Sequence, residues 1–175
     1  GLKSVQADIT AAFVHAHLPT TEQVYVHQPR GFYAPNTTSN SHVLKLKRAL
    51  YGLKQAPRHF FNYLSQHLTK HGLRQSSFDP CLFFGSNLVV IVYVDDLLIY
   101  SPTDDPIDRL IDALKADKIW IRKEDSAAGF LGVDMKDEQD GSLTLTQTGL
   151  TERIIVALGL HSHYSTTKDT PAEAA

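Results

Sequence analysis

The chain has 175 residues, 42% of them hydrophobic and 21% charged, an ordinary composition for a soluble globular protein with one sizeable core. Its single cysteine, Cys81, excludes an internal disulfide framework and favours a reducing compartment. No apolar run reaches membrane-spanning length, and the first residues do not form a signal peptide.

The net charge of −2 conceals two unlike halves. Residues 1–78 contain nine Lys or Arg but only two acids, Asp8 and Glu22, whereas residues 79–175 contain eight Lys or Arg and seventeen Asp or Glu. Such segregation predicts a face that binds a polyanion, and a solvated basic surface is the plainer alternative.

The first part of the chain is expected to form strands and loops. Residues 3–9 alternate loosely and predict a strand that ends at Asp8 and Ile9. Thr10 suits the N-cap of a brief helical turn over residues 11–14. Further expected elements are short strands at 24–26 and 43–47 and a polar loop at 34–42.

Residues 48–58 form an irregular segment, bracketed by Gly52 and Pro57, whose chemistry is unusual for a loop. It supplies an aromatic ring, a cation, an amide and a bidentate donor, from Tyr51, Lys54, Gln55 and Arg58. Pro57 suits the first turn of a helix that runs to about His71. The apolar side chains at helical spacing on its core face are Phe60, Phe61, Leu64 and Leu68.

Residues 88–100 predict a hairpin of two buried strands with Asp95 and Asp96 at its tip. Two adjacent carboxylates repel each other, and burial beside apolar strands adds to the cost unless a cation neutralises them. Two interpretations are open from the tip alone: a polar turn, which Asp favours, or a site for a divalent metal ion.

The remaining chain predicts two helices and three strands. The helices are expected at about 105–118 and 148–159, and the strands at 119–121, 130–135 and 142–146, the last two joined by an Asp140-Gly141 turn. Residues 161–175 resemble a tail. His161 and His163 lie within it, and without further ligands at suitable spacing this pair is interpreted as incidental.

This order of elements predicts an α+β fold, an antiparallel sheet backed by helices. Asp8 and the pair Asp95-Asp96 all lie at strand ends, so they cluster if their strands are neighbours. Three clustered acids require about two divalent cations, which is the arrangement that performs in-line phosphoryl transfer. Residues 23–78, which contain no Asp or Glu, would then hold a nucleic-acid backbone.

Several motifs together resemble the reverse transcriptases of copia-type LTR retrotransposons. The clearest is Tyr93-Val94-Asp95-Asp96 followed by apolar residues. The others are Asp8 with Ala12-Phe13, the segments 50–58, 78–82 and 130–133, and Asp169-Thr170-Pro171. The resemblance covers nearly the whole chain and strongly favours the metal interpretation of the Asp pair. It implies a polymerase palm with a ferredoxin-like core, partial fingers and the start of a thumb.

The resemblance also implies roles for individual residues. Asp8, Asp95 and Asp96 match the catalytic aspartates that bind two Mg²⁺ ions, with Mn²⁺ as an alternative, and the carbonyl of Ile9 would be a further ligand. Phe13 matches the aromatic gate that excludes a 2′-hydroxyl. The residues expected to face the incoming dNTP and the template are Tyr51, Gly52, Lys54, Gln55, Tyr93 and Val94. Phe130, Leu131 and Gly132 match the turn that grips the primer.

The expected activity is RNA-directed DNA synthesis, a nucleotidyl transfer from a dNTP to a primer 3′-hydroxyl. Residues 1–142 are assigned to the palm with partial fingers, and residues 143–175 to the start of the thumb or connection and a tail. The family's upstream basic fingers region is missing, so we expect a fragment with little activity alone.

Expected partners are an RNA or DNA template, a primer, and the integrase and ribonuclease H of the same polyprotein, without a membrane. The expected location is the cytoplasm, in a virus-like particle, with a nuclear stage.

Two other functions remain open at this point. One is a catalytically silent remnant that only binds nucleic acid. The other is a metal-dependent phosphotransferase that is not a polymerase, for which substitution of Phe13 would leave sugar discrimination unchanged.

Overall fold

The computed structural model describes residues 1–38, 41–124 and 129–160. The chain divides into two compact units, residues 1–127 and 128–175. The first unit is built on a six-stranded sheet, and the second on a hairpin followed by a helix. The assignment of residues 1–142 to the palm with partial fingers and of residues 143–175 to the start of a thumb remains a prediction.

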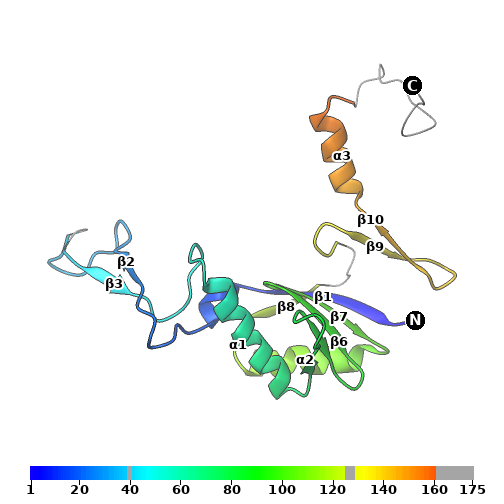
Figure 1. Cartoon of the computed structure of the whole chain (residues 1–175), viewed down its shortest axis with the longest axis horizontal. Coiled ribbons are helices and arrows are strands. Elements are labelled where there is room, and N and C mark those ends of the chain that lie inside the picture. The colour runs from blue at the N-terminus through cyan, green and yellow to red at the C-terminus, as the bar shows by residue number, and fades with distance from the viewer. Residues whose placement is uncertain (39–40, 125–128, 161–175) are drawn as a thin grey trace. The chain divides into compact units, whose positions relative to one another are not determined.

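The sheet of the first unit has the strand order β4-β5-β6-β7-β1-β8, and every neighbouring pair is antiparallel (Figure 1). Its strands are β1 (Lys3–Ile9), β4 (Arg74–Gln75), β5 (Leu82–Phe84), β6 (Val89–Tyr93), β7 (Asp96–Ser101) and β8 (Ile121–Glu124). The antiparallel α+β fold expected from the sequence is confirmed. The central position of β1 and β7 matters most, because it joins the two segments that carry the aspartates.

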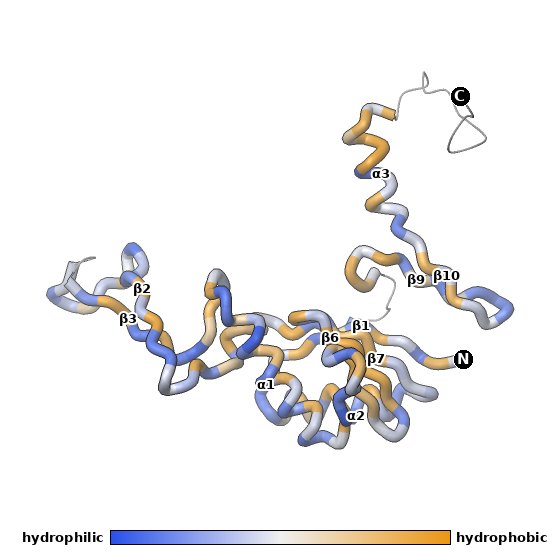
Figure 2. Tube along the Cα trace, in the orientation of Figure 1, coloured by the Kyte–Doolittle hydropathy of each residue, from blue (hydrophilic) through white to orange (hydrophobic). Residues whose placement is uncertain are grey.

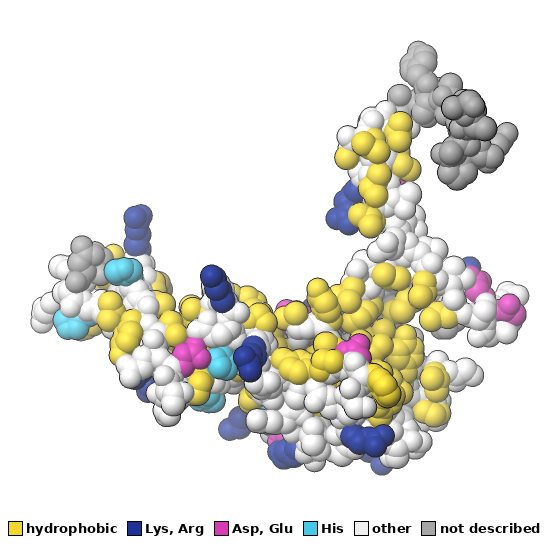
Figure 3. All heavy atoms as spheres, viewed as in Figure 1, with side chains coloured by type: hydrophobic (Ala, Val, Ile, Leu, Met, Phe, Trp, Pro, Cys, Tyr) yellow, Lys and Arg dark blue, Asp and Glu magenta, His cyan; other side chains and the backbone are white. Residues whose placement is uncertain are grey.

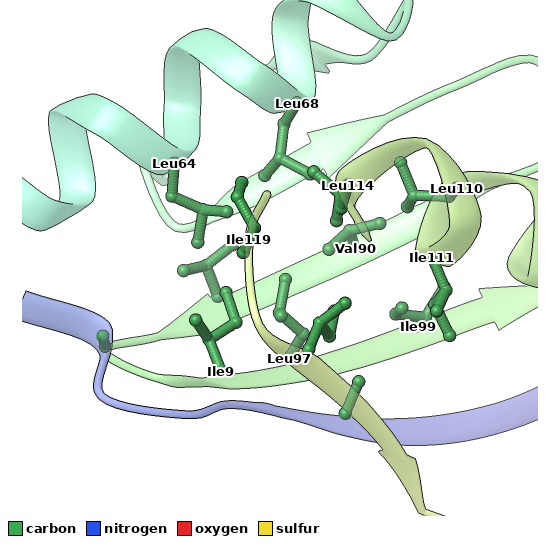
Figure 4. Packing of buried hydrophobic residues seen from close by; sticks show 14 of the residues in the cluster. Ile9, Leu64, Leu68, Val90, Leu97, Ile99, Leu110, Ile111, Leu114 and Ile119 are labelled. Atoms are coloured by element: carbon green, nitrogen blue, oxygen red, sulfur yellow. The ribbon is translucent and has the colours of Figure 1, made fainter. Parts of the chain in front are cut away.

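Two helices, α1 (Ala56–Lys70) and α2 (Asp104–Ala116), cover one face of this sheet (Figure 1). Each helix places apolar residues three or four positions apart, so one stripe is buried and the rest is solvated. The buried stripes consist of Phe60, Leu64 and Leu68 on α1, and Ile107, Leu110, Ile111 and Leu114 on α2. They meet Ile9, Val90, Leu97 and Ile99 of the sheet in a single core (Figure 4). Each fully buried aliphatic side chain contributes about 2 kcal/mol of transfer free energy.

Side chains of the central strands alternate between the two faces of the sheet, so the core beneath the helices takes every second residue. The core residues are Val5, Ala7 and Ile9 on β1 and Leu97 and Ile99 on β7, while Gln6 and Leu98 are also buried but point to the opposite face. Asp8 and Asp96 fall between these positions and therefore point to the opposite face of the sheet. Alternation thus keeps the carboxylates away from the helices and the apolar core.

A short arm and a turn connect β1 to α1. After the 3₁₀ helix η1 (Ala12–His15), strands β2 (Tyr25–His27) and β3 (Val43–Lys45) form a separate two-stranded sheet. Backbone hydrogen bonds join the two ends of this arm to each other just after η1, from Leu18 N–H to the Lys47 carbonyl and from Ala49 N–H to the Ala16 carbonyl.

The second unit contains β9 (Asp134–Asp137), β10 (Leu143–Thr146) and α3 (Thr148–Ala157). Helix α3 is apolar around much of its circumference (Figure 2), and none of its residues is buried. Among the described residues, no helix combines the length and apolar character needed to cross a membrane.

Several sequence expectations are corrected. The N-cap of η1 is Ala11 in a left-handed conformation, rather than Thr10. The two turn residues of the β6–β7 hairpin are Val94 and Asp95, because Tyr93 pairs with Asp96.

The bounds of several strands also differ from expectation. Strand β8 begins at Ile121, where the expected strand ended, and the short strand β4 was not expected. Residues 130–133 form a tight turn with a single bridge between Phe130 and Val133, and the strand starts only at Asp134. Residues 161–175, with His161 and His163, lie outside the described residues.

Candidate active site

Three aspartates lie at the same end of the central strands. Asp8 on β1 lies directly opposite Asp96 on β7. Directly opposed residues of antiparallel strands have Cβ atoms about 5 Å apart and point to the same face. Asp95 occupies the adjoining turn, and its carbonyl accepts a hydrogen bond of 2.8 Å from the Ile9 N–H. The neighbouring strands that the clustering of these acids required are therefore present.

The turn that carries Asp95 is strained. Val94 has a φ of 54°, which is unusual for a β-branched residue and costs about 1–2 kcal/mol. Such conformations persist only where the surrounding structure holds them, and they concentrate at functional sites. Tyr93 pairs with Asp96, so the two side chains lie on the same face of the sheet, the face opposite the helices. Tyr93 is half exposed there, beside the carboxylates.

The electrostatics of the cluster favour a cation. Burial raises the pKa of Asp96, and the carboxylates of Asp95 and Asp8 raise it further. The amide of Gln6, two residues before Asp8 on the same face of β1, acts in the opposite direction. The folded chain thus concentrates more negative charge here than its own side chains neutralise, and hard divalent cations prefer such carboxylate oxygens.

The donor set fits a divalent metal ion in its chemistry. Among the residues that the structure describes, however, no three His, Cys, Asp or Glu side chains converge closely enough as they stand to hold an ion. Metal ligation by Asp8, Asp95, Asp96 and the Ile9 carbonyl therefore remains a prediction. Its support is the adjacency of the strands and the mutual repulsion of the acids.

An aromatic contact links the strand of Asp8 to the irregular segment before α1. The rings of Phe13 and Tyr51 have centroids 4.4 Å apart, and Phe60 lies edge-on to Phe13 at 6.2 Å. Phe13 is half-buried while Tyr51 is 52% exposed. The structure therefore brings together two residues that the sequence resemblance assigned to nucleotide binding.

The segment around Tyr51 presents cations to solvent. Gly52 has a φ of 98°, a conformation that glycine adopts at little cost. Lys54 and Arg58 are exposed, and within the described residues neither forms an ion pair. On the face shown in Figure 3, Lys and Arg side chains project from this part of the first unit. Gln55 is the N-cap of α1, but its side chain does not cap the helix.

The turn expected to grip a primer lies in the second unit. Leu131 and Gly132 have φ values of 55° and 75°, and the Val133 N–H donates to the Phe130 carbonyl at 3.0 Å. Phe130 is buried and Leu131 is exposed at the tip. The geometry is that of a tight turn, and its contact with a primer remains a prediction.

Comparison with known proteins identifies the family. The family model for reverse transcriptase (RNA-dependent DNA polymerase) matches residues 3–174. The chain belongs to the reverse transcriptase family. It is 33% identical over 140 residues to the Retrovirus-related Pol polyprotein from transposon RE2 of Arabidopsis thaliana, and 32% identical over 164 residues to that from transposon TNT 1-94 of Nicotiana tabacum. A Ty1-MR1 Gag-Pol polyprotein of Saccharomyces cerevisiae is 27% identical over 157 residues.

These matches cover 78%, 88% and 85% of this reverse transcriptase chain, but only 9%, 12% and 8% of the respective relatives. The chain therefore spans about a tenth of the length of those polyproteins. The expected resemblance to copia-type retrotransposon reverse transcriptases is confirmed at the level of the family.

Sequence reasoning missed two charged residues at the reverse transcriptase site. Arg122 on β8 lies directly opposite Asp8, so an exposed cation borders the acids, and its Nη2 lies 3.5 Å from Glu124 Oε1. The strand predicted from the sequence ended at Ile121 and so left out Arg122. Only the register of β1 with β8 shows that Arg122 faces Asp8. The second residue is Glu22, whose carboxylate contacts Gln55 and His59.

Proposed function

We propose that this reverse transcriptase segment forms the palm of an RNA-directed DNA polymerase, with partial fingers and the start of a thumb. The reaction is nucleotidyl transfer, in which a primer 3′-hydroxyl attacks the α-phosphorus of a dNTP and pyrophosphate leaves. The observation that carries the proposal is the register of Asp8 against Asp96, with Asp95 in the adjoining turn.

In this proposal Asp8, Asp95, Asp96 and the Ile9 carbonyl would hold two Mg²⁺ ions, or Mn²⁺ ions. Bound there, the ions would stabilise the charge that develops on the attacking and leaving oxygens. The chain's own contribution is to hold the carboxylates together despite their repulsion. The buried faces of β1 and β7 provide that rigidity, because Ala7, Ile9 and Leu97 are fully buried.

The aromatic pair would select the sugar. Phe13 would lie under the sugar of the incoming nucleotide and exclude a 2′-hydroxyl by steric overlap. Its contact with Tyr51 supports this role, because a ring packed on two sides cannot turn aside to admit the extra oxygen.

The exposed surfaces on either side would bind substrate. Lys54 supplies a cation for phosphate, Gln55 an amide for the nucleotide or template, and Gly52 a backbone that a ligand can approach closely. At the hairpin, Tyr93 and Val94 would lie near the primer end, and in the second unit the turn Phe130-Leu131-Gly132 would contact the primer.

Template, primer, integrase and ribonuclease H are the proposed partners, because the relatives are Pol polyproteins. The test is primer extension on an RNA template with dNTPs and Mg²⁺, by this chain and by the longer Pol polyprotein expected to contain it. We expect extension by the longer protein and little by the chain alone. Asp95→Asn should reduce extension about a thousandfold, since several kcal/mol of transition-state stabilisation are lost. Extension that survives this substitution would contradict the proposal.

A second candidate is a silent nucleic-acid-binding remnant, favoured by Lys54 and Arg58 alone, two exposed cations without an ion pair in the described part of the chain. It predicts salt-dependent binding by the longer protein without any Mg²⁺-dependent nucleotide addition.

A further inference from the structure

Glu22 is an acid in an unexpected place. Between Asp8 and Asp79 it is the only Asp or Glu of the sequence, and it lies in the segment proposed to bind a polyanion. A carboxylate there opposes that binding, so its presence calls for a physical reason. The side chain is only 26% exposed, between η1 and β2, and it does not project freely into solvent.

Both oxygens of Glu22 are engaged by the first turn of α1. Oε1 accepts a hydrogen bond from the Gln55 amide nitrogen Nε2, and Oε2 lies 2.8 Å from His59 Nε2. These two contacts prevent the carboxylate from rotating. The hydrogen bond from Gln55 is the main reason that the pKa of Glu22 is lowered, so the group is ionised near neutral pH. An acid at a helix N-terminus is also favourable to the helix dipole.

The consequence for Gln55 follows from the chemistry of its amide. A glutamine amide can turn by 180°, which exchanges its donor and acceptor ends at almost no steric cost. A carboxylate accepts hydrogen bonds and donates none, so it permits only the orientation in which Nε2 points toward Glu22. Oε1 and the second N–H of Gln55 then keep fixed directions. Within the described part of the chain, no group donates a hydrogen bond to Gln55 Oε1.

We infer that Glu22 is a positioning residue for Gln55, which fixes the amide orientation in which Gln55 receives the incoming nucleotide. The inference rests on the proposed function, because the orientation of Gln55 matters only if this site binds a nucleotide. Glu22 does not touch the substrate, and acts only through Gln55.

A purely structural role is the competing explanation, since Glu22 also ties the segment before β2 to α1. The other end of the same helix provides a matched control. Asp117, beyond α2, accepts hydrogen bonds from Lys70 and His67 and contacts His71 at 2.9 Å. Both carboxylates thus fasten α1 from outside, but only Glu22 contacts a residue of the proposed site.

The test substitutes Glu22→Gln, which keeps the size of the side chain and one acceptor but lets the amide of Gln55 adopt either orientation. In primer extension by the longer Pol polyprotein, we expect the dNTP KM to rise about threefold to tenfold, the effect of one weakened hydrogen bond, with kcat within about twofold. Asp117→Asn should lower the melting temperature at least as much and leave KM unchanged. If Asp117→Asn does not fold, Asp105→Asn, which breaks an ion pair with Arg109 on α2, replaces it.

A double-mutant cycle separates positioning from independent binding. With Gln55→Ala already present, Glu22→Gln should cause no further change in KM, because its only route to the substrate is gone. Additive effects on KM, or an unchanged KM in Glu22→Gln alone, would overturn the inference while leaving the polymerase proposal intact. Failure of the wild-type protein to extend any primer would instead refute both.

Discussion

Two regions of the first unit contain opposite charges that the folded chain leaves uncompensated. At the strand ends, Asp8, Asp95 and Asp96 repel one another, and the pKa of Asp96 is raised. Before α1, Lys54 and Arg58 are exposed, and among the described residues they form no ion pair. A fold selected for stability alone would pair these charges with each other. In the proposed function each group meets an external partner, a cation in one case and a polyanion in the other.

The two regions differ in rigidity as well as in sign. Asp8 and Asp96 are carried by strands whose alternate residues fill the core, and Asp95 lies in the turn that directly precedes Asp96, so packing of the strands fixes the positions of the acids. The cations are carried by an irregular segment attached through backbone hydrogen bonds and the Phe13–Tyr51 contact. Metal chemistry needs precise ligands, whereas phosphate binding by lysine tolerates movement, so the difference matches the proposed roles.

The largest change in nucleic-acid binding is expected on the basic side. Lys54→Ala with Arg58→Ala should weaken binding of a primer–template by tens of fold near 0.1 M salt. The slope of log K against log salt should fall by about 1.5 to 2, because two phosphate contacts no longer release counterions. Fluorescence anisotropy across a salt series measures both. Lys115→Ala, an exposed cation on α2, is the control, and an unchanged slope in the double variant would remove these residues from the interface.

A smaller effect is expected at the aromatic contact between η1 and the segment before α1. Tyr51→Ala should lower discrimination of dNTP against rNTP about threefold to tenfold, the value of one aromatic pair, because Phe13 loses a neighbour at 4.4 Å. Phe13→Ala should lower discrimination further, and Tyr51→Phe should preserve it. The measurement is the ratio of kcat/KM for matched nucleotides. Equal discrimination in Tyr51→Ala and the wild type would show that this contact is not needed for selection.

The fold was predictable where a single period dominates the sequence. The stripe of Phe60, Leu64 and Leu68 predicted α1 to within a residue at each end, and the apolar runs around Asp95 predicted the β6–β7 hairpin. Prediction failed where backbone conformation overrode the pattern. Left-handed residues at 131 and 132 turn the expected strand at 130–135 into a tight turn, and nothing in its apolar character signals this.

The sequence supplied a set of candidate site residues, which remain predictions, but not the contacts among them. Motif resemblance selected Asp8, Gln55 and Phe13, whereas the partners of those residues come from strand register and loop packing. Arg122 faces Asp8 only because β8 pairs with β1, and Glu22 reaches Gln55 across 33 positions of sequence. The one available signal in the sequence was that Glu22 is the single acid between Asp8 and Asp79.

The repulsion at the aspartates is expected to lower the thermal stability of the fold. The folded pKa of Asp96 is raised, so the folded state loses stability relative to the unfolded state as pH rises above the unfolded pKa. Asp96→Asn should therefore raise the melting temperature by a few degrees at pH 7 without metal, and the gain should shrink as pH falls toward that pKa.

Mg²⁺ provides the second readout for the same variant. It should stabilise the wild type more than Asp96→Asn, because binding to the folded state alone raises stability. Asp112→Asn, an exposed acid on α2, is the control and should alter neither the pH dependence nor the response to Mg²⁺. An equal response to Mg²⁺ in all three proteins would contradict metal binding by Asp96.

The smallest expected change in the free energy of unfolding tests whether the backbone at the hairpin tip is strained, independently of its charge. Val94→Gly should stabilise the fold by about 0.5–1 kcal/mol, since the cost of a β-branched residue at φ 54° exceeds the added entropy of glycine in the unfolded chain. Val43→Gly, at an exposed β3 position without positive φ, should destabilise by a similar amount. Urea unfolding of both variants measures the difference. If Val94→Gly is instead as destabilising as Val43→Gly, the turn is not strained, and repulsion among the three carboxylates alone distinguishes this tip from the basic segment before α1.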